Sequence, residues 1–301
     1  MLDVPLPAEP LYLPFEAAPY RMSMGLVARD PSELISIDEH YREEIAQRRR
    51  ILGEHRPEVV AGEPGAEPAC AALLHHLAAV LPRQYPAWFE RRDRSLRNHL
   101  TGEVWALDAD PLEAAALLVQ EDLCLLQLRD GVPYLVAGTL LFTPGWRLLD
   151  KLGHPLGTVH GPVPFYADRL ARPVDRFMRH LAPGKLAERL NWGLHDNPAL
   201  FRPGKHFRSE LNPAVTPTNA ADTLFLRVER QTLSRLDLAD VILFTIRTHL
   251  YPLRRVISVP GVPARLAEAV RALPPEMQLY KSIAPFRDAC LAFLDAVSAD
   301  R

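Results

Sequence analysis

Hydrophobic residues in the N-terminal third of the chain recur at helical spacing. One series follows the segment Asp30–Glu33, where an acidic N-cap residue precedes a proline at the first helical position. Its apolar members are Leu34, Ile37, Tyr41 and Ile45. This pattern predicts an amphipathic helix from Asp30 to about Arg50, and a second series predicts another over Ala69–Leu81, ended by Pro82.

Further along, short apolar runs are typical of β-strands. Residues 122–129 and 134–142 flank the dipeptide Asp130-Gly131, which predicts a hairpin with a tight turn. Residues 223–233 and 241–250 are joined by a short link, so we expect a second antiparallel pair.

The order of these elements predicts the fold class. Helices come first, then a hairpin, an irregular loop, a helix, an irregular segment and a second hairpin, and helical patterns close the chain over 264–273 and 277–297, the latter bent at Pro285. Strands that come in hairpins favour an antiparallel α+β sheet over a doubly wound one.

We expect three parts in one compact unit. Residues 1–121 would form an extended segment and helices packed on the core, residues 122–253 the core, and residues 254–301 the C-terminal helices.

The second pair of strands carries polar residues in a period of two. They are Arg227, Glu229 and Gln231 in the first strand, and Thr245, Arg247 and His249 in the second. Each set shares one face of its strand because side chains alternate. Whether the two sets share one face of the sheet depends on the pairing register, which the sequence leaves open.

The loop between the hairpins, Leu141–Tyr166, is rich in residues that restrict the backbone. It contains four glycines and four prolines, and a loop shaped in this way can hold a side chain rigidly. His160 lies in it between Val159 and the run Gly161–Pro164. A neutral imidazole held there could present a nitrogen lone pair to a haem iron, although a loop histidine can equally form a local hydrogen bond.

Composition excludes several classes of function. Lys and Arg number 35 against 37 Asp and Glu, so no net field favours nucleic acid or an anionic membrane. We find no apolar run long enough to span a membrane and no signal-peptide pattern, and we expect a soluble cytoplasmic protein. The three cysteines, Cys70, Cys124 and Cys290, have no metal-binding spacing and are expected to be buried thiols.

Common catalytic motifs do not assign a function. The sequence has no P-loop, no dinucleotide-binding glycine motif, and neither a zinc-protease nor a serine-hydrolase signature. Three candidates remain besides the histidine. Arg189 and Trp192 would suit a porphyrin edge and its propionate, or else be a surface cation and a core aromatic. Glu229, beside Arg230, would bind a cationic substrate or form a cross-strand salt bridge.

At these residues the sequence resembles the haem-dependent oxidative N-demethylase family, in its haem-binding subunit. No single segment is specific, but the ordered set runs from about Asp122 to Leu253. The segments are Phe142–Trp146, Asp150–Gly153, Val159–Pro164, Arg176-Phe177, Arg189–Trp192, Arg227–Leu233, Arg235-Leu236 and Leu243–Thr248.

The resemblance implies a PAS-like fold that holds haem b, with O2 as co-substrate. It implies oxidative removal of a methyl group from a small secondary amine such as dimethylamine, with electrons from NADPH through FMN and iron–sulfur centres on partner reductase subunits. On this chain, the resemblance makes His160 the iron ligand and Trp192 a pocket wall. It makes Arg189, Arg230 and Arg247 propionate or pocket cations, and Glu229 the group that binds the amine.

Two other functions stay open at this stage. A PAS-like haem protein could act as a gas or redox sensor without catalysis, although we find no sustained heptads of the kind that link sensors to output domains. A domain that has lost haem could also act as a scaffold.

Overall fold

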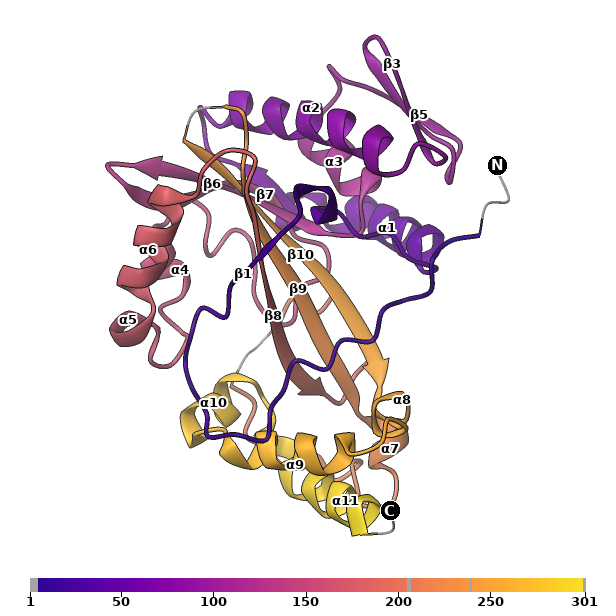
Figure 1. Cartoon of the computed structure of the whole chain (residues 1–301), viewed down its shortest axis with the longest axis vertical. Coiled ribbons are helices and arrows are strands. Elements are labelled where there is room, and N and C mark those ends of the chain that lie inside the picture. The colour runs from indigo at the N-terminus through magenta and orange to yellow at the C-terminus, as the bar shows by residue number, and fades with distance from the viewer. Residues whose placement is uncertain (1–4, 205–206, 239, 300–301) are drawn as a thin grey trace.

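A seven-stranded antiparallel sheet runs through the centre of the computed structural model, which describes residues 5–204, 207–238 and 240–299 (Figure 1). The strand order is β1-β8-β9-β10-β6-β7-β2. The strands are β1 (Val27–Arg29), β2 (Val60–Gly62), β6 (Asp122–Arg129), β7 (Val132–Thr139), β8 (Leu186–His195), β9 (Phe225–Arg235) and β10 (Val241–Pro252). This sheet, with helices before and after it in the chain, confirms the predicted antiparallel α+β class and its PAS-like sheet.

Both predicted hairpins are present. β6 and β7 pair around Asp130 and Gly131, whose φ angles of 50° and 76° are those that a tight hairpin turn requires. β9 and β10 pair over their whole length, with Glu229 opposite Thr248 and Arg230 opposite Arg247. The division of the chain into three parts at residues 121 and 253 stays a prediction. Residues 1–4 of the first part and residues 300 and 301 of the last part lie outside the described residues.

Strand β8 was missed by the sequence analysis, which assigned an irregular segment there. Its sequence has no clear alternation, because the charged residues Glu188 and Arg189 are neighbours. The structure explains this pattern, since both faces of the strand are covered. Glu188 pairs with Arg230 on one face, and Arg189 points to the other.

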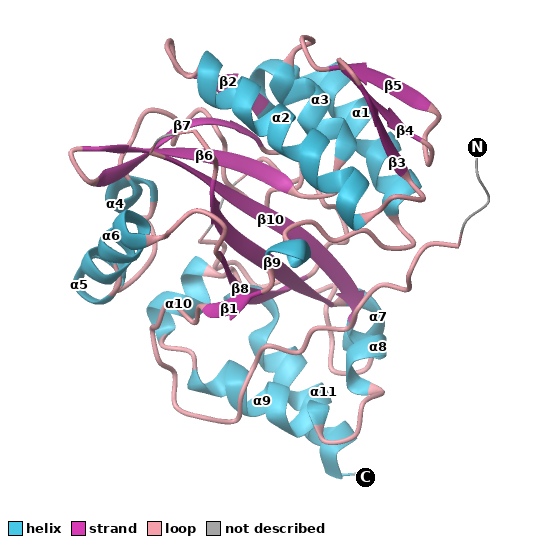
Figure 2. Ribbon diagram, turned by 45° about the horizontal axis from the view of Figure 1, so that its top comes forward, coloured by secondary structure: helices cyan, strands magenta, loops and turns pink. Residues whose placement is uncertain are grey.

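The helices lie in three groups around the sheet (Figure 2). The first group packs together with a small sheet, β3 (Phe89–Arg92), β4 (Ser95–Asn98) and β5 (Glu103–Ala106), and comprises α1 (Tyr41–Val59), α2 (Glu67–Gln84) and α3 (Pro111–Leu118). The second comprises α4 (Leu156–Val159), α5 (Tyr166–Arg169) and α6 (Ala171–His180). The third comprises α7 (Ala220–Thr223), α8 (Leu253–Ile257), α9 (Val262–Ala272), α10 (Pro275–Tyr280) and α11 (Arg287–Ala299).

The first helix starts later than predicted. The Asp30 cap forms, with its side chain accepting a hydrogen bond from Ser32 N at 2.8 Å, but it closes only a 3-10 turn over Pro31–Glu33. The chain then forms no regular helix before Tyr41, because Ser36 N donates to Glu121 at 2.8 Å and Asp38 N donates to Gln120 at 3.1 Å. These side chains replace the helical hydrogen bonds, so α1 begins at Tyr41.

Two further helix boundaries differ from prediction. Helix α2 does not stop at Pro82 but includes it in its last turn, ending at Gln84. The predicted helix over 277–297 is divided rather than bent, since Pro285 lies in a 3-10 turn between α10 and α11. Helix α9 confirms the predicted helix over 264–273.

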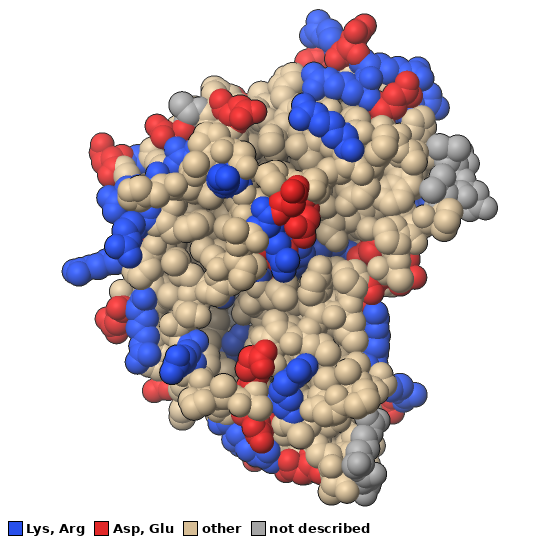
Figure 3. Space-filling model, viewed as in Figure 1, with Lys and Arg blue, Asp and Glu red and all other residues tan. Residues whose placement is uncertain are grey.

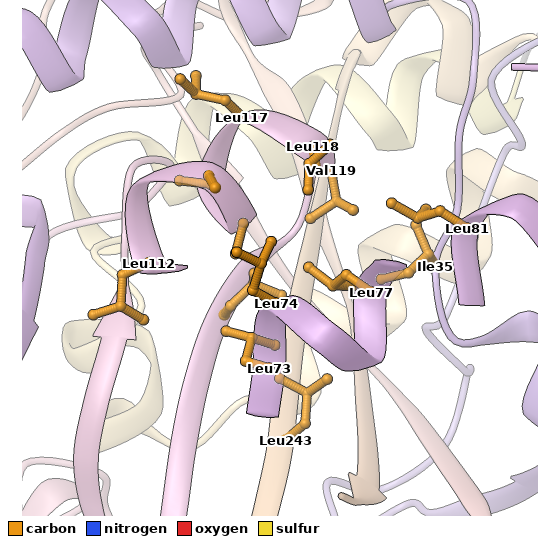
Figure 4. Close-up of a cluster of buried hydrophobic side chains, with 14 of the residues drawn as sticks. Ile35, Leu73, Leu74, Leu77, Leu81, Leu112, Leu117, Leu118, Val119 and Leu243 are labelled. Atoms are coloured by element: carbon orange, nitrogen blue, oxygen red, sulfur yellow. The ribbon is translucent and has the colours of Figure 1, made fainter. Parts of the chain in front are cut away.

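Apolar side chains of the first helical group form a large part of the core (Figure 4). Leucines of α2 meet those of α3, the apolar link before α1 and Leu243 of β10. The other face of β6 and β7 is covered by α4 and α6 through Leu156 and Met178. The two faces of the central sheet are thus buried against different helical groups.

A buried ion pair fixes the start of the long loop. Asp122 accepts hydrogen bonds from the backbone N–H groups of Leu141 and Phe142, each at 2.9 Å, and from Arg48 Nη1 at 3.0 Å. Asp122 and Arg48 are both buried. The loop that was predicted to be rigid is therefore held at its first residues by a carboxylate of β6.

Charged residues of both signs are interspersed on the surface. Lys and Arg alternate with Asp and Glu over the face seen in Figure 3. Among the described residues, no helix has both the length and the apolar character needed to cross a bilayer.

Candidate functional site

A cavity of about 390 Å³ opens where β8 and β9 approach the segment after α10. Its size falls in the range of small-molecule sites. Its walls come from four parts of the chain: the loop after β7, the end of β8 with the loop that follows it, β9, and the residues after α10. They are Pro144–Trp146, Asn191–Asp196, Arg202–Gly204, Arg208, Arg227, Glu229 and Tyr280–Ser282.

The alternation of side chains decides which polar residues can reach this cavity. In β9, Arg227 and Glu229 line it, and Arg230, the residue after Glu229, points to the opposite face. Because Arg230 pairs with Arg247 across the strands, Arg247 also lies on that opposite face. The two polar sets of β9 and β10, whose relation the sequence left open, are therefore on different faces of the sheet.

Arg230 and Arg247 form buried ion pairs away from the cavity. Arg230 Nε lies 2.6 Å from Glu188 Oε2. Arg247 Nη2 lies 2.6 Å from Asp38 Oδ2, and its Nη1 lies 2.9 Å from Glu44 Oε2. The contact of Arg230 joins β9 to β8, and those of Arg247 join the sheet to the segments around α1. The structure does not bring the two arginines to the cavity.

Glu229 does line the cavity, and its carboxylate is held in place. Its Oε2 accepts hydrogen bonds from Asn191 Nδ2 at 3.2 Å and from Gln231 Nε2 at 3.0 Å. The Oε1 atom has a weaker contact, 3.5 Å from Arg227 Nε. Glu229 therefore presents an oriented oxygen to a donor inside the cavity.

Lys281 is a cavity residue that the sequence analysis did not single out. Its Nζ donates to Trp192 O and, at 3.2 Å, to Asn191 Oδ1. Burial lowers the pKa of Lys281 to about 8, although the nearby Glu229 acts in the opposite direction. The amide of Asn191 thus connects a lysine that can lose its proton near neutral pH with the carboxylate of Glu229.

His160 lies at the end of the short helix α4 and is not among the described residues that line the cavity. Its Nδ1 is 3.0 Å from Leu156 O, and a carbonyl oxygen can only accept, so Nδ1 carries the proton and Nε2 keeps its lone pair. The ring stacks on Tyr166, with centroids 4.4 Å apart and planes 13° apart. Burial lowers the pKa of His160 to about 4, so the ring is neutral at neutral pH.

Arg189 is near both His160 and Glu229 and has incomplete hydrogen bonding. Besides burial, the charge of Arg189 helps to lower the pKa of His160, and Arg189 shares its face of the sheet with Glu229. Within the described chain, no carboxylate lies within salt-bridge distance of Arg189, and its buried Nε has no partner. The buried hydroxyl of Tyr166 also has none there.

Trp192 contributes to the wall of this cavity. Its ring packs edge-on against Phe15 of the N-terminal segment, with centroids 5.5 Å apart. Lys281 Nζ lies 5.7 Å from the ring centroid. The tryptophan therefore links the N-terminal segment to the cavity.

Three other cavity residues were not identified from the sequence: His195, Arg202 and Arg227. Arg227 could have been, because the period of two placed it with Glu229. His195 lies on the same face of β8 as Arg189 and Asn191, because these residues are separated by even numbers of positions. This signal can be used only if the strand is recognised. For Arg202, in the loop after β8, we see no signal in the sequence.

The fold and these residues define an α+β protein with a polar cavity in the size range of small-molecule sites, and with a neutral histidine whose Nε2 keeps its lone pair. Residues 25–291 match the family model of haem-dependent oxidative N-demethylase, alpha subunit-like proteins. The match covers most of the chain, and the chain belongs to this family. The family name describes a haem-dependent oxidative demethylase and, as an alpha-subunit-like protein, implies other subunits.

Proposed function

We propose that this chain binds haem b between the loop of His160 and the sheet face of Arg189 and Glu229, and that it oxidatively demethylates a small secondary amine such as dimethylamine. The observation that carries this proposal is the tautomer of His160. Its Nδ1–H donates to Leu156 O, which fixes the ring and directs the lone pair of Nε2 away from the helix.

The neighbouring residues fit a porphyrin. A haem carries carboxylate groups, and Arg189 is a largely buried cation without a carboxylate partner in the described chain. The unpartnered Tyr166 hydroxyl beside His160 is a further polar atom that a bound group could satisfy. His160 would ligate the iron, Arg189 would pair with a propionate, and Trp192 would form part of the wall.

The protein's own contribution is binding and orientation. A bound haem would supply the oxygen-dependent oxidation of the N-methyl group. Glu229 would accept a hydrogen bond from the ammonium of the amine through Oε1, while Asn191 and Gln231 hold Oε2. The carboxylate is oriented before the amine arrives, so less ordering remains to be done on binding.

The electrons required would come from partner subunits with NADPH, FMN and iron–sulfur centres. The family's description as alpha-subunit-like supports such partners. We further propose a cytoplasmic location, as the sequence suggested.

The ligand assignment is tested with the visible spectrum of the purified protein after addition of haem. We expect a Soret band in the wild type, a changed ligand field in His160→Ala, and its recovery when free imidazole is added. His154→Ala serves as the matched control, because His154 lies exposed on the same loop. A wild type that takes up no haem would refute the proposal, and an unchanged spectrum in His160→Ala would refute the ligand.

Activity is tested with the haem-loaded protein, a chemical reductant and dimethylamine, by measuring formaldehyde. We expect the wild type to release formaldehyde. In Glu229→Gln the KM for dimethylamine should increase about 10- to 100-fold, because a hydrogen bond to a charged group is lost. If haem binds but no small amine yields formaldehyde, the gas-sensor function replaces the enzymatic one.

A further inference from the structure

The end of the cavity farthest along β8 has a surplus of positive charge. Asp196 is fully engaged there, because it forms two hydrogen bonds with Arg208, at 2.7 and 2.8 Å, and accepts a third from Asn212. Arg202 has no carboxylate within salt-bridge distance in the described part of the chain. The local cations are thus incompletely balanced by the protein itself.

Arg202 is positioned by the backbone rather than by an anion. Its N–H donates to Thr143 O at 3.1 Å, and its carbonyl accepts from Gly145 N at 2.8 Å. These bonds tie it to the start of the long loop. The loop therefore helps to hold Arg202 in the cavity wall. The guanidinium is partly buried there, and this burial lowers its pKa.

His195 acts as a hydrogen-bond donor towards this end of the cavity. Its Nδ1 lies 3.2 Å from Arg202 Nη1, and since a guanidinium can only donate, Nδ1 is the acceptor. The neutral ring must then carry its proton on Nε2. Nε2 lies above the backbone of Gly193, where a Cβ atom would be 3.5 Å from it, and the ring lines the cavity. This is the opposite tautomer to that of His160.

Arg227 adds a second guanidinium at the same end. It is buried, its Nη2 donates to Thr248 Oγ1 at 3.0 Å and to Phe142 O, and its closest carboxylate contact is the 3.5 Å one to Glu229. Arg202, Arg227 and His195 thus line one cavity, and each brings hydrogen-bond donors to it. Such a set matches the acceptors of a carboxylate.

We propose that His195, Arg202 and Arg227 form a carboxylate-binding subsite, a proposal that extends the proposed function. The carboxylate can have two sources. It is either a propionate of the haem, or a carboxylate on the amine substrate itself, which would make the substrate an N-methylated amino acid. In the second case the ammonium would bind Glu229, which lies two residues along the strand from Arg227 and whose Oε1 lies 3.5 Å from Arg227 Nε.

Two matched pairs of compounds distinguish these sources. In the first arm, haem and its dimethyl ester, which lacks free carboxylates, are titrated into the apoprotein and followed by Soret absorbance. In the second arm, N-methylglycine and its neutral amide are titrated into the full chain and followed by calorimetry. Each arm is run on the wild type, on Arg202→Gln, and on Arg147→Gln as a control. Arg147 is an exposed cation that lies outside the cavity lining.

In one of the arms, we expect the compound with the carboxylate to bind about 10- to 100-fold more tightly than its partner, in the wild type and in Arg147→Gln. Arg202→Gln should lose most of that preference. Arg202→Lys should keep part of it, because lysine keeps the charge but cannot form the bidentate hydrogen bonds of a guanidinium. A preference in the haem arm identifies a propionate, and one in the amine arm identifies a substrate carboxylate.

Equal binding within both pairs, or a preference that Arg202→Gln leaves unchanged, would overturn the subsite. If the wild type takes up no haem, the proposed function fails. The subsite is then decided by the calorimetric arm on the apoprotein, where a preference for N-methylglycine supports it and equal binding refutes it.

Discussion

Lys281 provides a quantitative test of the cavity. Its pKa lies near 8 in the folded protein and at an ordinary value of 10.5 in the unfolded chain. Between these two pH values the unfolded chain binds more protons than the folded one, so the contribution of Lys281 to stability rises with pH. Integration from pH 7 to pH 9.5 gives about 2 kcal/mol for this single group.

Other groups titrate in the same range, so the measurement must be a difference. Burial raises the pKa of the Cys70 thiol to about 11 and that of Cys290 to about 12, and these thiols make the protein less stable as pH rises. Both remain in Lys281→Met and cancel when the variant is compared with the wild type. Lys185→Met, at an exposed lysine, controls for the loss of a positive charge.

The assay is urea unfolding followed by far-UV circular dichroism at pH 7 and pH 9.5. The change in unfolding free energy between the two pH values should be about 2 kcal/mol more positive in the wild type than in Lys281→Met. Lys185→Met should behave as the wild type does. A difference below about 0.5 kcal/mol would mean that Lys281 is solvated, and the electrostatic description of the cavity would be wrong.

Three more predictions test other parts of the structure. Arg247→Met should cost about 3–5 kcal/mol of stability, measured by urea unfolding, because it leaves Asp38 buried without its cation. It should leave the affinity for haem unchanged, and a loss of more than about tenfold would place Arg247 in the site. Asp122→Ala should cost a similar amount, about 3–5 kcal/mol, by leaving a buried guanidinium unpaired, and a thermal midpoint equal to that of the wild type would contradict the anchoring of the loop. Nitrogen-15 spectra of labelled histidine in the apoprotein at pH 7 should show His160 protonated at Nδ1 and His195 at Nε2, and the same tautomer for both rings would refute the assignments.

Much of the fold could be predicted because its signals are local. The turn at Asp130 and Gly131 requires positive φ angles, and the apolar spacing of α2 marks a buried face, so neither depends on distant residues. The start of α1 could not be predicted. Its apparent first turn is replaced by hydrogen bonds to Gln120 and Glu121, which lie far along the chain.

The candidate site could be predicted only in part, because some of its residues are brought together by distant parts of the chain. Glu229 was found because a charged residue within a strand requires a polar environment, and the structure places it at the cavity. Arg230 is its neighbour in sequence but lies on the other face, because side chains alternate along a strand. Which of the two faces carries the cavity depends on contacts with distant parts of the chain. Lys281 belongs to a segment that looked like a continuous helix. It reaches the cavity because that helix ends at Tyr280.

The arginines on the two sides of the central sheet differ in whether a carboxylate neutralises their charge, and this difference bears on function. On one face, Arg230 and Arg247 each lie within 2.6 Å of a carboxylate, so their burial is compensated within the chain. On the other, Arg189 of β8 has no carboxylate within salt-bridge distance among the described residues, and neither has Arg202 in the loop after β8. Removing a charge from water without a partner costs several kcal/mol, which the folded protein alone would not recover. A bound anion would supply the missing partners on that face, so a ligand with carboxylate groups should stabilise the chain as well as occupy its cavity.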